Sequence, residues 1–344
     1  MIAPHPRARL VFGGAERDGA ALAVAARELV LNLRASGVGP GDRIGWIGTN
    51  HPDMLVALFA AAETGAALVP FNWRLAEEEW RWIAEHAAIR VLLRGMSHEG
   101  ALAAMPPPTR AERGRGGASP PAPPPHIPLL IGYTSGTTGR PKGAMLPRSA
   151  FLANAAASRA IFDLTPDDRV LTVLPMFHVG GLNIQTVPAL LQGATVILHE
   201  RFDPDAFFDA VERDRPTLSL LVPAVMAALV AHPRWERAEL SSLRAVGAGS
   251  SDVPLPLIEA FHARGVPVQQ VYGATETSPI AIAQTREEAL AAPGSIGRPV
   301  PGVAARIAPE TGELQVRGPV VMSGYLNDPA ATAAALRDGW FATG

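Results

Sequence analysis

The sequence predicts an α/β fold with two helix-wrapped, largely parallel β-sheet subdomains in an αβαβα sandwich, followed by a small β-barrel. Apolar runs of strand length alternate with stretches of helical length along most of the chain, which is typical of parallel sheets covered by crossover helices. A Pro- and Gly-rich segment at 105–127 interrupts this alternation. After residue 294 the pattern changes to short strands between Gly and Pro turns, which indicates the small barrel.

The first α/β subdomain is expected to span residues 1–104. Its first helix is predicted from the apolar stripe of Leu22, Ala26, Leu29 and Leu33, which ends at Gly37. The other elements expected here are strands at 44–47, 67–69 and 91–93 and helices at 52–64 and 75–87.

Residues 105–127 are expected to form a surface linker, because Pro and Gly dominate their composition. The second α/β subdomain is then expected at 128–293, and the β-barrel at 294–344, where the chain cuts it short. The strands expected in the second subdomain lie at 129–133, 170–174, 194–198, 217–222, 243–246 and 267–271. Its expected helices lie at 147–161, 183–192, 204–214, 223–231 and 254–264.

The composition favours a cytoplasmic enzyme that acts on small molecules. The 344 residues are 48% hydrophobic with a formal net charge of −2, so the chain can bury a large core and shows no basic excess for nucleic acid. It has no cysteine, which excludes disulfides, zinc–thiolate sites and cysteine nucleophiles. The N-terminus lacks the apolar stretch of a signal peptide. The most apolar run, 54–70, is broken by Glu63 and Gly65, so we expect no membrane span.

One basic residue differs in kind from all the others. Lys142 is the only lysine in the chain, and every other basic side chain is an arginine. A coding bias toward arginine accounts for those positions. The lysine at 142 therefore suggests a place where a compact point charge must enter a crowded anion site.

The segment from Tyr133 to Gly143 follows an apolar strand and is rich in hydroxyl groups and glycines. Glycines let successive backbone N–H groups point at one anion, the hydroxyls add donors, and Lys142 adds a charge. This combination predicts a phosphate-binding loop, against the alternative of an ordinary flexible Ser/Gly loop. The loop is not of the Walker A type, because Pro141 precedes the lysine and Gly143 follows it.

A second polar segment, from Gln270 to Thr277, also follows a predicted strand. Tyr272 could stack on a base, Gly273 permits close approach, and the Thr275 hydroxyl could meet a phosphate. The carboxylate of Glu276 could hold Mg²⁺ through oxygen. Tyr-Gly turns after strands are common, so this segment gains its weight from the phosphate loop that accompanies it.

Together these two segments resemble the adenylate-forming superfamily, which includes acyl-CoA synthetases, firefly luciferase and the adenylation domains of peptide synthetases. Further matches follow in the order expected for that superfamily, from about residue 20 to the end of the chain. They lie at 175–181, the acid-pocket motif; 247–249, beside the nucleotide; 294–302 and 312–318, entering the small barrel; and 339–344, the start of the ribose-binding motif. The chain is similar to the large N-terminal domain of the acyl-CoA ligase branch.

The resemblance implies a reaction in which ATP and a carboxylic acid form acyl-AMP and pyrophosphate, after which coenzyme A takes the acyl group. The implied cofactors are ATP, Mg²⁺ and coenzyme A. Residues implied to bind the nucleotide are Thr134, Ser135, Gly136, Thr137, Thr138, Gly139, Lys142, Gly247, Ala248, Gly249, Gln270, Tyr272, Gly273 and Thr275. Residues implied to be catalytic are Lys142, Thr275, Glu276 and His178, and the metal ligands are Glu276 and Thr138.

The acid substrate is expected in a pocket formed by other matched segments. The residues implied to line it are His178, Gly180, Gly181, Val222, Pro223 and Gly249. His178 is implied to lie near the reacting carboxylate, and the competing interpretation is a half-buried structural histidine. The apolar members could equally be plain core residues.

Two departures from the superfamily pattern lead us to expect an incomplete enzyme. The superfamily places an Asp after the Thr-Gly of the ribose motif, whereas this chain ends at Gly344. It also has a smaller C-terminal lid domain with a catalytic lysine, and Lys142 already has another implied role. The chain alone is therefore expected to bind nucleotide weakly and to catalyse poorly.

Three alternatives remain at this point. An amino-acid adenylation domain would place an Asp near Phe177 and His178, where this chain has no carboxylate, so a fatty or aryl acid is the preferred substrate. A truncated, non-catalytic nucleotide- or acyl-binding module is the second alternative. A hydrolase is disfavoured, because 247–251 does not fit a Gly-x-Ser-x-Gly elbow. The oligomeric state is open, with a homodimer as one option, and so is the choice between coenzyme A and a carrier protein as the thiol acceptor.

Overall fold

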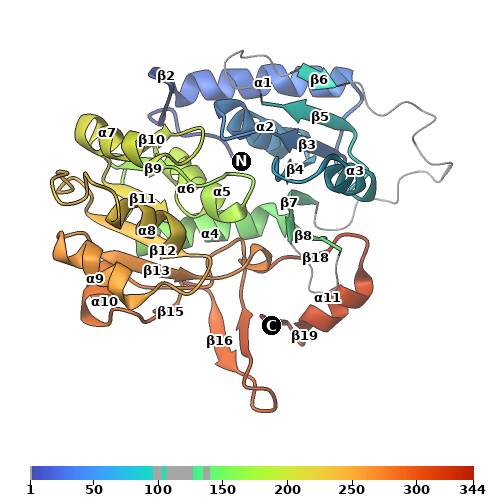
Figure 1. Ribbon diagram of the computed structural model, residues 1–344. Coiled ribbons are helices and arrows are strands. Elements are labelled where there is room, and N and C mark those ends of the chain that lie inside the picture. Colours follow the sequence, from blue (N-terminus) through green and yellow to red (C-terminus); the bar gives the residue numbers. More distant parts are fainter. Residues whose placement is uncertain (1, 96–102, 106–126, 135–139) are drawn as a thin grey trace.

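The computed structural model describes residues 2–95, 103–105, 127–134 and 140–344. Figure 1 shows two large sheets with their helices and, below them, a smaller C-terminal sheet (orange to red). The expected linker at 105–127 lies almost entirely outside the described residues, apart from Met105 and Ile127.

The first sheet contains seven described strands. They are β3 (Arg43–Ile47), β4 (Ala67–Phe71), β5 (Val91–Arg94), β6 (Ala103–Met105), β7 (Pro128–Thr134), β8 (Lys142–Pro147) and β18 (Gly324–Tyr325). They lie in the order β18-β8-β7-β4-β3-β5-β6. The four central strands, β7, β4, β3 and β5, are parallel, whereas β8, β18 and β6 pair antiparallel at the two edges.

The second sheet contains nine described strands. They are β1 (Arg9–Phe12), β2 (Ala15–Asp18), β9 (Arg169–Thr172), β10 (Thr195–Leu198), β11 (Leu218–Leu221), β12 (Ala245–Gly249), β13 (Val268–Tyr272), β14 (Ile282–Ala283) and β15 (Arg298–Pro299). Their order is β15-β14-β13-β12-β11-β9-β10-β1-β2, and the pairings from β13 to β1 are parallel.

The helices begin and end at residues with the expected local chemistry. The bounds are α1 (Gly19–Ala35), α2 (Pro52–Thr64), α3 (Glu77–His86), α4 (Arg148–Ile161), α5 (Val179–Asn183), α6 (Thr186–Gln192), α7 (Pro204–Asp214), α8 (Pro223–Val230), α9 (Leu255–Ala263), the 3₁₀ turn η1 (Thr275–Thr277), α10 (Arg286–Ala291) and α11 (Pro329–Ala335). The Asp18 side chain caps α1 by accepting a hydrogen bond from the backbone N–H of Ala21. Pro52 supplies the first residue of α2, and Gly65 ends that helix with a φ of 77°.

The first sheet is buried on both faces, and β4 shows this within five residues. Leu68 points into the main core, which the two large sheets share. Ala67, Val69 and Phe71 point the other way and pack with Ile83 of α3 in a second cluster. A strand buried on both faces reads as a continuous apolar run, which is what the segment from 67 to 71 shows.

Strands that are neighbours in the sequence do not all belong to the same sheet. The hairpin of β1 and β2, at the N-terminus, pairs with β10 in the second sheet, whereas β7 and β8 pair in the first sheet. The predicted first subdomain, 1–104, therefore contributes β1 and β2 to the second sheet, and the predicted second subdomain, 128–293, contributes β7 and β8 to the first. The subdomain boundaries at 104 and 128 stay predictions. No described helix is long and apolar enough to cross a membrane.

The C-terminal segment forms an antiparallel sheet of four described strands. They are β16 (Ala304–Ile307), β17 (Leu314–Arg317), β19 (Leu336–Arg337) and β20 (Trp340–Ala342), in the order β16-β17-β20-β19. The sequence predicts a truncated β-barrel in this segment. Among the described strands β16 and β19 do not pair with each other, so the four strands form an open sheet.

A buried ionic network joins the amino ends of three neighbouring strands in the second sheet. Asp168 precedes β9 and accepts hydrogen bonds from Arg244, before β12, at 3.0 Å and from Thr217, before β11, at 2.6 Å. Burial alone would raise the pKa of Asp168, but the bonds from Arg244 and Thr217 outweigh it and lower this pKa.

Replacing Asp168 by Asn should lower the free energy of unfolding at pH 7 by about 2–3 kcal/mol, because it leaves the Arg244 guanidinium without its counter-charge. A carboxylate with a lowered pKa stabilises the fold above its unfolded pKa and loses this contribution as pH falls. Denaturant unfolding should therefore show the two proteins converging below about pH 4. Asp167→Asn, at the exposed neighbouring carboxylate, is the control. An equal loss in both variants would contradict the assignment.

Candidate functional site

The predicted site residues gather where parallel strands of both large sheets end. The carboxyl ends of β4 and β7 lie at one edge of the first sheet, and those of β9, β11, β12 and β13 lie at one edge of the second. The residues at or just beyond these ends are Trp73, Arg74, Thr134, Phe177, His178, Val222, Gly249 and Tyr272. The carboxyl edge is where open α/β sheets bind their ligands.

The two sheets approach each other closely at Gly132 of β7 and Thr275 of η1. A Cβ atom at Gly132 would lie 2.6 Å from Cγ2 of Thr275. Only glycine leaves the room for this approach. Within η1 the Thr277 hydroxyl accepts a hydrogen bond from the Ala274 N–H at 2.9 Å, which holds the turn that presents Thr275 and Glu276.

The described ends of the predicted phosphate loop lie opposite each other on β7 and β8. Thr134 pairs with Lys142 in the antiparallel register, and its hydroxyl donates to the Lys142 carbonyl at 3.4 Å. The other predicted loop residues lie outside the described part of the chain: Ser135, Gly136, Thr137, Thr138 and Gly139.

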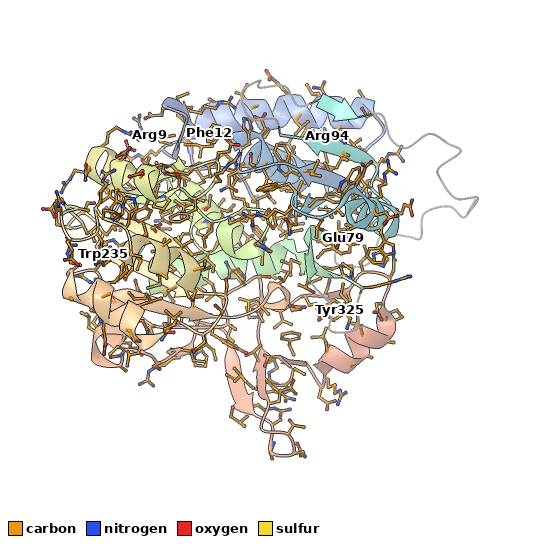
Figure 2. All side chains as sticks on the ribbon, viewed as in Figure 1. Arg9, Phe12, Glu79, Arg94, Trp235 and Tyr325 are labelled. Atoms are coloured by element: carbon orange, nitrogen blue, oxygen red, sulfur yellow. The ribbon has the colours of Figure 1, made fainter. Side chains whose placement is uncertain are left out.

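A tyrosine connects the predicted phosphate and metal ligands. The Tyr325 hydroxyl donates to Oε1 of Glu276 at 2.8 Å, and Nζ of Lys142 lies 5.4 Å from the centroid of the Tyr325 ring. Burial and the adjacent negative charge of Glu276 raise the pKa of Tyr325, so the hydroxyl keeps its proton and donates. Figure 2 shows Tyr325 between α11 and the strands above it.

Glu276 suits a hard cation that also binds the phosphates of a nucleotide. Its side chain is 8% exposed, and only one carboxylate oxygen accepts a hydrogen bond from the described residues. The described residues contain no group of three or more His, Cys, Asp or Glu side chains that could hold a metal by themselves. Mg²⁺ is commonly held by one or two carboxylates together with phosphate oxygens and water, so the donors present fit it.

The predicted nucleotide residues of the second sheet divide into two groups. Gly249 and Gly273 lie at strand ends, where a Cβ atom would come within 2.2 Å of the Val271 carbonyl oxygen and 1.8 Å of the Pro279 carbonyl oxygen, respectively. Tyr272 is partly exposed beside them.

The second group lies further inside the sheet. A Cβ atom at Gly247 would face the Leu220 and Phe162 side chains at 3.0 and 3.1 Å, and Ala248 is fully buried. The Gln270 amide donates to the Ser295 carbonyl at 2.8 Å. These three residues lie within their strands, and their roles in binding the nucleotide stay predictions.

The predicted acid-pocket residues surround the start of α5. A Cβ atom at Gly180 would lie 3.8 Å from Cδ1 of Ile184 and 3.9 Å from the Ser250 hydroxyl, so a methyl group would make ordinary contacts there without overlap. At Gly181 a Cβ atom would lie 2.4 Å from the Pro175 carbonyl oxygen, which makes this glycine a packing requirement. Val222 and Pro223 lie at the start of α8, just past the end of β11.

His178 is not a buried structural histidine. Its side chain is exposed and makes no hydrogen bond with the described residues, and its ring lies 4.3 Å from that of Phe177. Partial burial of the imidazole and, after it, the positive charge of Arg74 lower the pKa of His178. The imidazole is therefore neutral at pH 7.

An aromatic cluster that the sequence did not indicate supports the start of the loop. The Tyr133 hydroxyl and Nδ1 of His86 are 2.7 Å apart, and the Trp82 ring stacks on that histidine with centroids 4.8 Å apart. Arg140, just after the loop, lies over the same tryptophan at 6.0 Å. Helix α3 thus contacts residues on both sides of the predicted phosphate loop.

Comparison with known proteins identifies the family of this chain. Residues 4–326 match the family of AMP-binding enzymes. The chain belongs to this family. It is 45% identical to indoleacetate–CoA ligase of Aromatoleum aromaticum, over 94% of this chain and 70% of that protein. It is 39% identical to feruloyl-CoA synthase of an Amycolatopsis species, over 100% and 73%.

Solved structures of AMP-binding enzymes have the same fold. The N-terminal domain of FACL13 from Mycobacterium tuberculosis superposes with a TM-score of 0.85 at 28% identity, covering 98% of this chain and 92% of that one. The o-succinylbenzoate coenzyme A synthetase of Bacillus subtilis in complex with ATP and magnesium gives 0.83 at 28% identity, covering 97% and 73%. The expected fold class, and the match to the family's large N-terminal domain, are confirmed.

In this AMP-binding enzyme, Tyr325→Phe should raise the Mg²⁺ concentration needed for half-maximal pyrophosphate release by roughly tenfold, because Glu276 loses the hydrogen bond that orients it. The measurement is a Mg²⁺ titration at saturating ATP with the full-length gene product, and thermal unfolding checks that the fold is intact. An unchanged Mg²⁺ requirement in a normally folded variant would contradict a link between Tyr325 and the metal ligand.

Gly132→Ala should weaken ATP binding and destabilise the fold by about 1–3 kcal/mol, because its new methyl group overlaps Cγ2 of Thr275. Thr275→Ser removes that Cγ2 atom and keeps the hydroxyl. Calorimetric ATP binding and unfolding should therefore show that the double variant recovers part of the loss. Strictly additive losses would argue that the close approach is unimportant.

Proposed function

We propose that this AMP-binding enzyme activates an aryl carboxylic acid with ATP and transfers the acyl group to coenzyme A. The observation that carries the proposal is that two groups of residues with different chemistry lie at the carboxyl ends of the strands. Lys142 and Glu276, joined through Tyr325, would form a phosphate and metal corner, whereas the segment 175–181, which carries His178 and Gly180, contains no carboxylate. Without a carboxylate to pair with an amino group, an amino-acid substrate is disfavoured.

In the first half-reaction a carboxylate oxygen attacks the α-phosphorus of ATP, and the bond to pyrophosphate breaks. Lys142 and the loop hydroxyls would stabilise the charge that builds on pyrophosphate. Mg²⁺, held by Glu276 with Thr138, would supply further positive charge to the phosphates. The residues proposed to bind the nucleotide are Thr134, Ser135, Gly136, Thr137, Thr138, Gly139, Gly249, Tyr272, Gly273 and Thr275.

In the second half-reaction the coenzyme A sulfur attacks the acyl carbonyl, and AMP leaves. His178 would border the reacting carboxylate as a neutral hydrogen-bonding group, because its pKa is lowered. Similarity to ligases of indoleacetate and ferulate points to an aryl acid as the substrate. We also propose a cytoplasmic location, where ATP and coenzyme A are available.

The test is pyrophosphate release by the full-length gene product with ATP, Mg²⁺ and aryl, fatty or amino acids, each with and without coenzyme A. We expect release that depends on an aryl acid and thioester only when coenzyme A is present. Preference for a fatty acid would correct the substrate class. ATP binding without release for any acid would instead support a non-catalytic binding module.

Lys142→Ala should slow pyrophosphate release by roughly 100-fold, because it removes a charge that faces the departing phosphates. Single-turnover release at saturating ATP measures this step. Lys142→Arg keeps the charge but not the compact shape, and it should recover only part of the rate. Normal release by the alanine variant would count against the role proposed for Lys142.

A further inference from the structure

Arg74 lies at the functional edge but has no role in the proposed function so far. It follows β4, which pairs in parallel with β7, so it leaves the first sheet at the same edge as Thr134. Its backbone N–H donates to Oδ1 of Asn72 at 3.0 Å, which holds the turn after the strand. The topology therefore brings a guanidinium to the place where ligands enter.

The guanidinium of Arg74, an exposed residue, lies over aromatic rings from segments of both sheets. Its Cζ atom lies 4.9 Å from the centroid of the Trp73 ring and 5.8 Å from that of Phe177. Phe177 belongs to the acid-pocket segment of the second sheet, and its ring lies beside that of His178. Contact with ring faces orients the planar guanidinium and leaves its N–H groups available.

No described carboxylate neutralises Arg74. It has no ion pair, and its guanidinium donates no hydrogen bond, to the residues that the structure describes. Arg81 of α3 provides a contrast, because it lies over the Trp80 ring at 5.9 Å and is also paired with Glu77. A contact with an aromatic ring alone thus does not indicate a binding residue. Arg74 differs from Arg81 because it has no counter-charge among the described residues and contacts the predicted acid-pocket segment.

The reaction brings two anions together, and each needs a counter-charge. Lys142 lies with Glu276 and Tyr325 in the phosphate corner, on β8. Arg74 instead contacts the segment that carries His178. We propose that Arg74 binds the carboxylate of the incoming acid beside His178, before that carboxylate reacts with ATP. This inference rests on the proposed function and adds the residue that recognises the reacting group.

Arg74→Gln should raise the KM for the acid roughly 10- to 100-fold, because a charged hydrogen-bond donor to a carboxylate is lost. The KM values for ATP and coenzyme A should stay within about twofold, and Arg74→Lys should be intermediate, since lysine cannot form the bidentate pair. Arg81→Gln, which removes another exposed arginine that lies over a tryptophan ring, is the control and should leave the KM for the acid unchanged.

Other outcomes would overturn the proposal. A higher KM for coenzyme A alone would mean that Arg74 binds a phosphate of that substrate. A higher KM for ATP alone would place Arg74 in the phosphate corner. Unchanged values for all three substrates would mean that the guanidinium binds none of them.

A second readout does not depend on turnover. The positive charge of Arg74 contributes to the lowered pKa of His178, so NMR titration of the imidazole should show a higher pKa in Arg74→Gln and no change in Arg81→Gln. An unchanged His178 pKa in Arg74→Gln would contradict the proximity on which the inference depends. If the unmodified enzyme releases no pyrophosphate with any acid, the proposed function fails, and calorimetric binding of the free acid to Arg74→Gln still decides the role of Arg74.

Discussion

The contact between Gly132 and Thr275 is the constraint on which the site depends. The predicted phosphate loop begins at the end of β7 in the first sheet, and the segment proposed to bind adenine and metal follows β13 in the second, so their spacing depends on how closely the sheets approach. A single methyl group at residue 132 would push η1 away by overlapping Thr275. Turn η1 is also joined to the segment that carries Tyr325. The N–H of Met322 donates to the Glu276 carbonyl at 2.7 Å, and Tyr325 follows three residues later. The positions of Gly132, η1 and Tyr325, which come from three separate parts of the chain, therefore depend on one another.

In the second sheet, polar groups at the amino ends of the strands differ in role from those at the carboxyl ends. At the amino ends of its strands, Asp168, Thr217 and Arg244 satisfy one another in a network that leaves no group for a ligand. At the carboxyl ends, by contrast, the side chains of His178 and Arg74 make no hydrogen bond with the described residues. Polar groups that are satisfied internally stabilise a fold, whereas polar groups held in place but unsatisfied are available to a substrate.

Much of the fold could be predicted because its signals are local. Helices such as α7, bounded at Pro204 and Asp214, follow from caps and apolar spacing within a few residues. Strand partners could not be predicted, since nothing in β7 indicates that it pairs with β4 rather than with its neighbours in the second sheet. The site shows the same division. Lys142 and Glu276 stand in recognisable segments, but Tyr325 lies 49 residues from Glu276 and Arg74 is far along the chain from Phe177, so their roles emerge only in three dimensions.

The single lysine has a consequence for an enzyme that produces mixed anhydrides. Acyl-adenylates react with amines, and an intermediate that escapes from the site would acylate nearby lysine side chains of its own enzyme. Apart from Lys142, all the Lys and Arg positions of this chain are arginines, whose guanidinium stays protonated and is a poor nucleophile. Within residues 1–344, acylation of a lysine therefore has a single target. This one amine side chain stands beside Tyr325 at the phosphate corner, so any acyl group found on a lysine of this chain would report directly on leakage within the site.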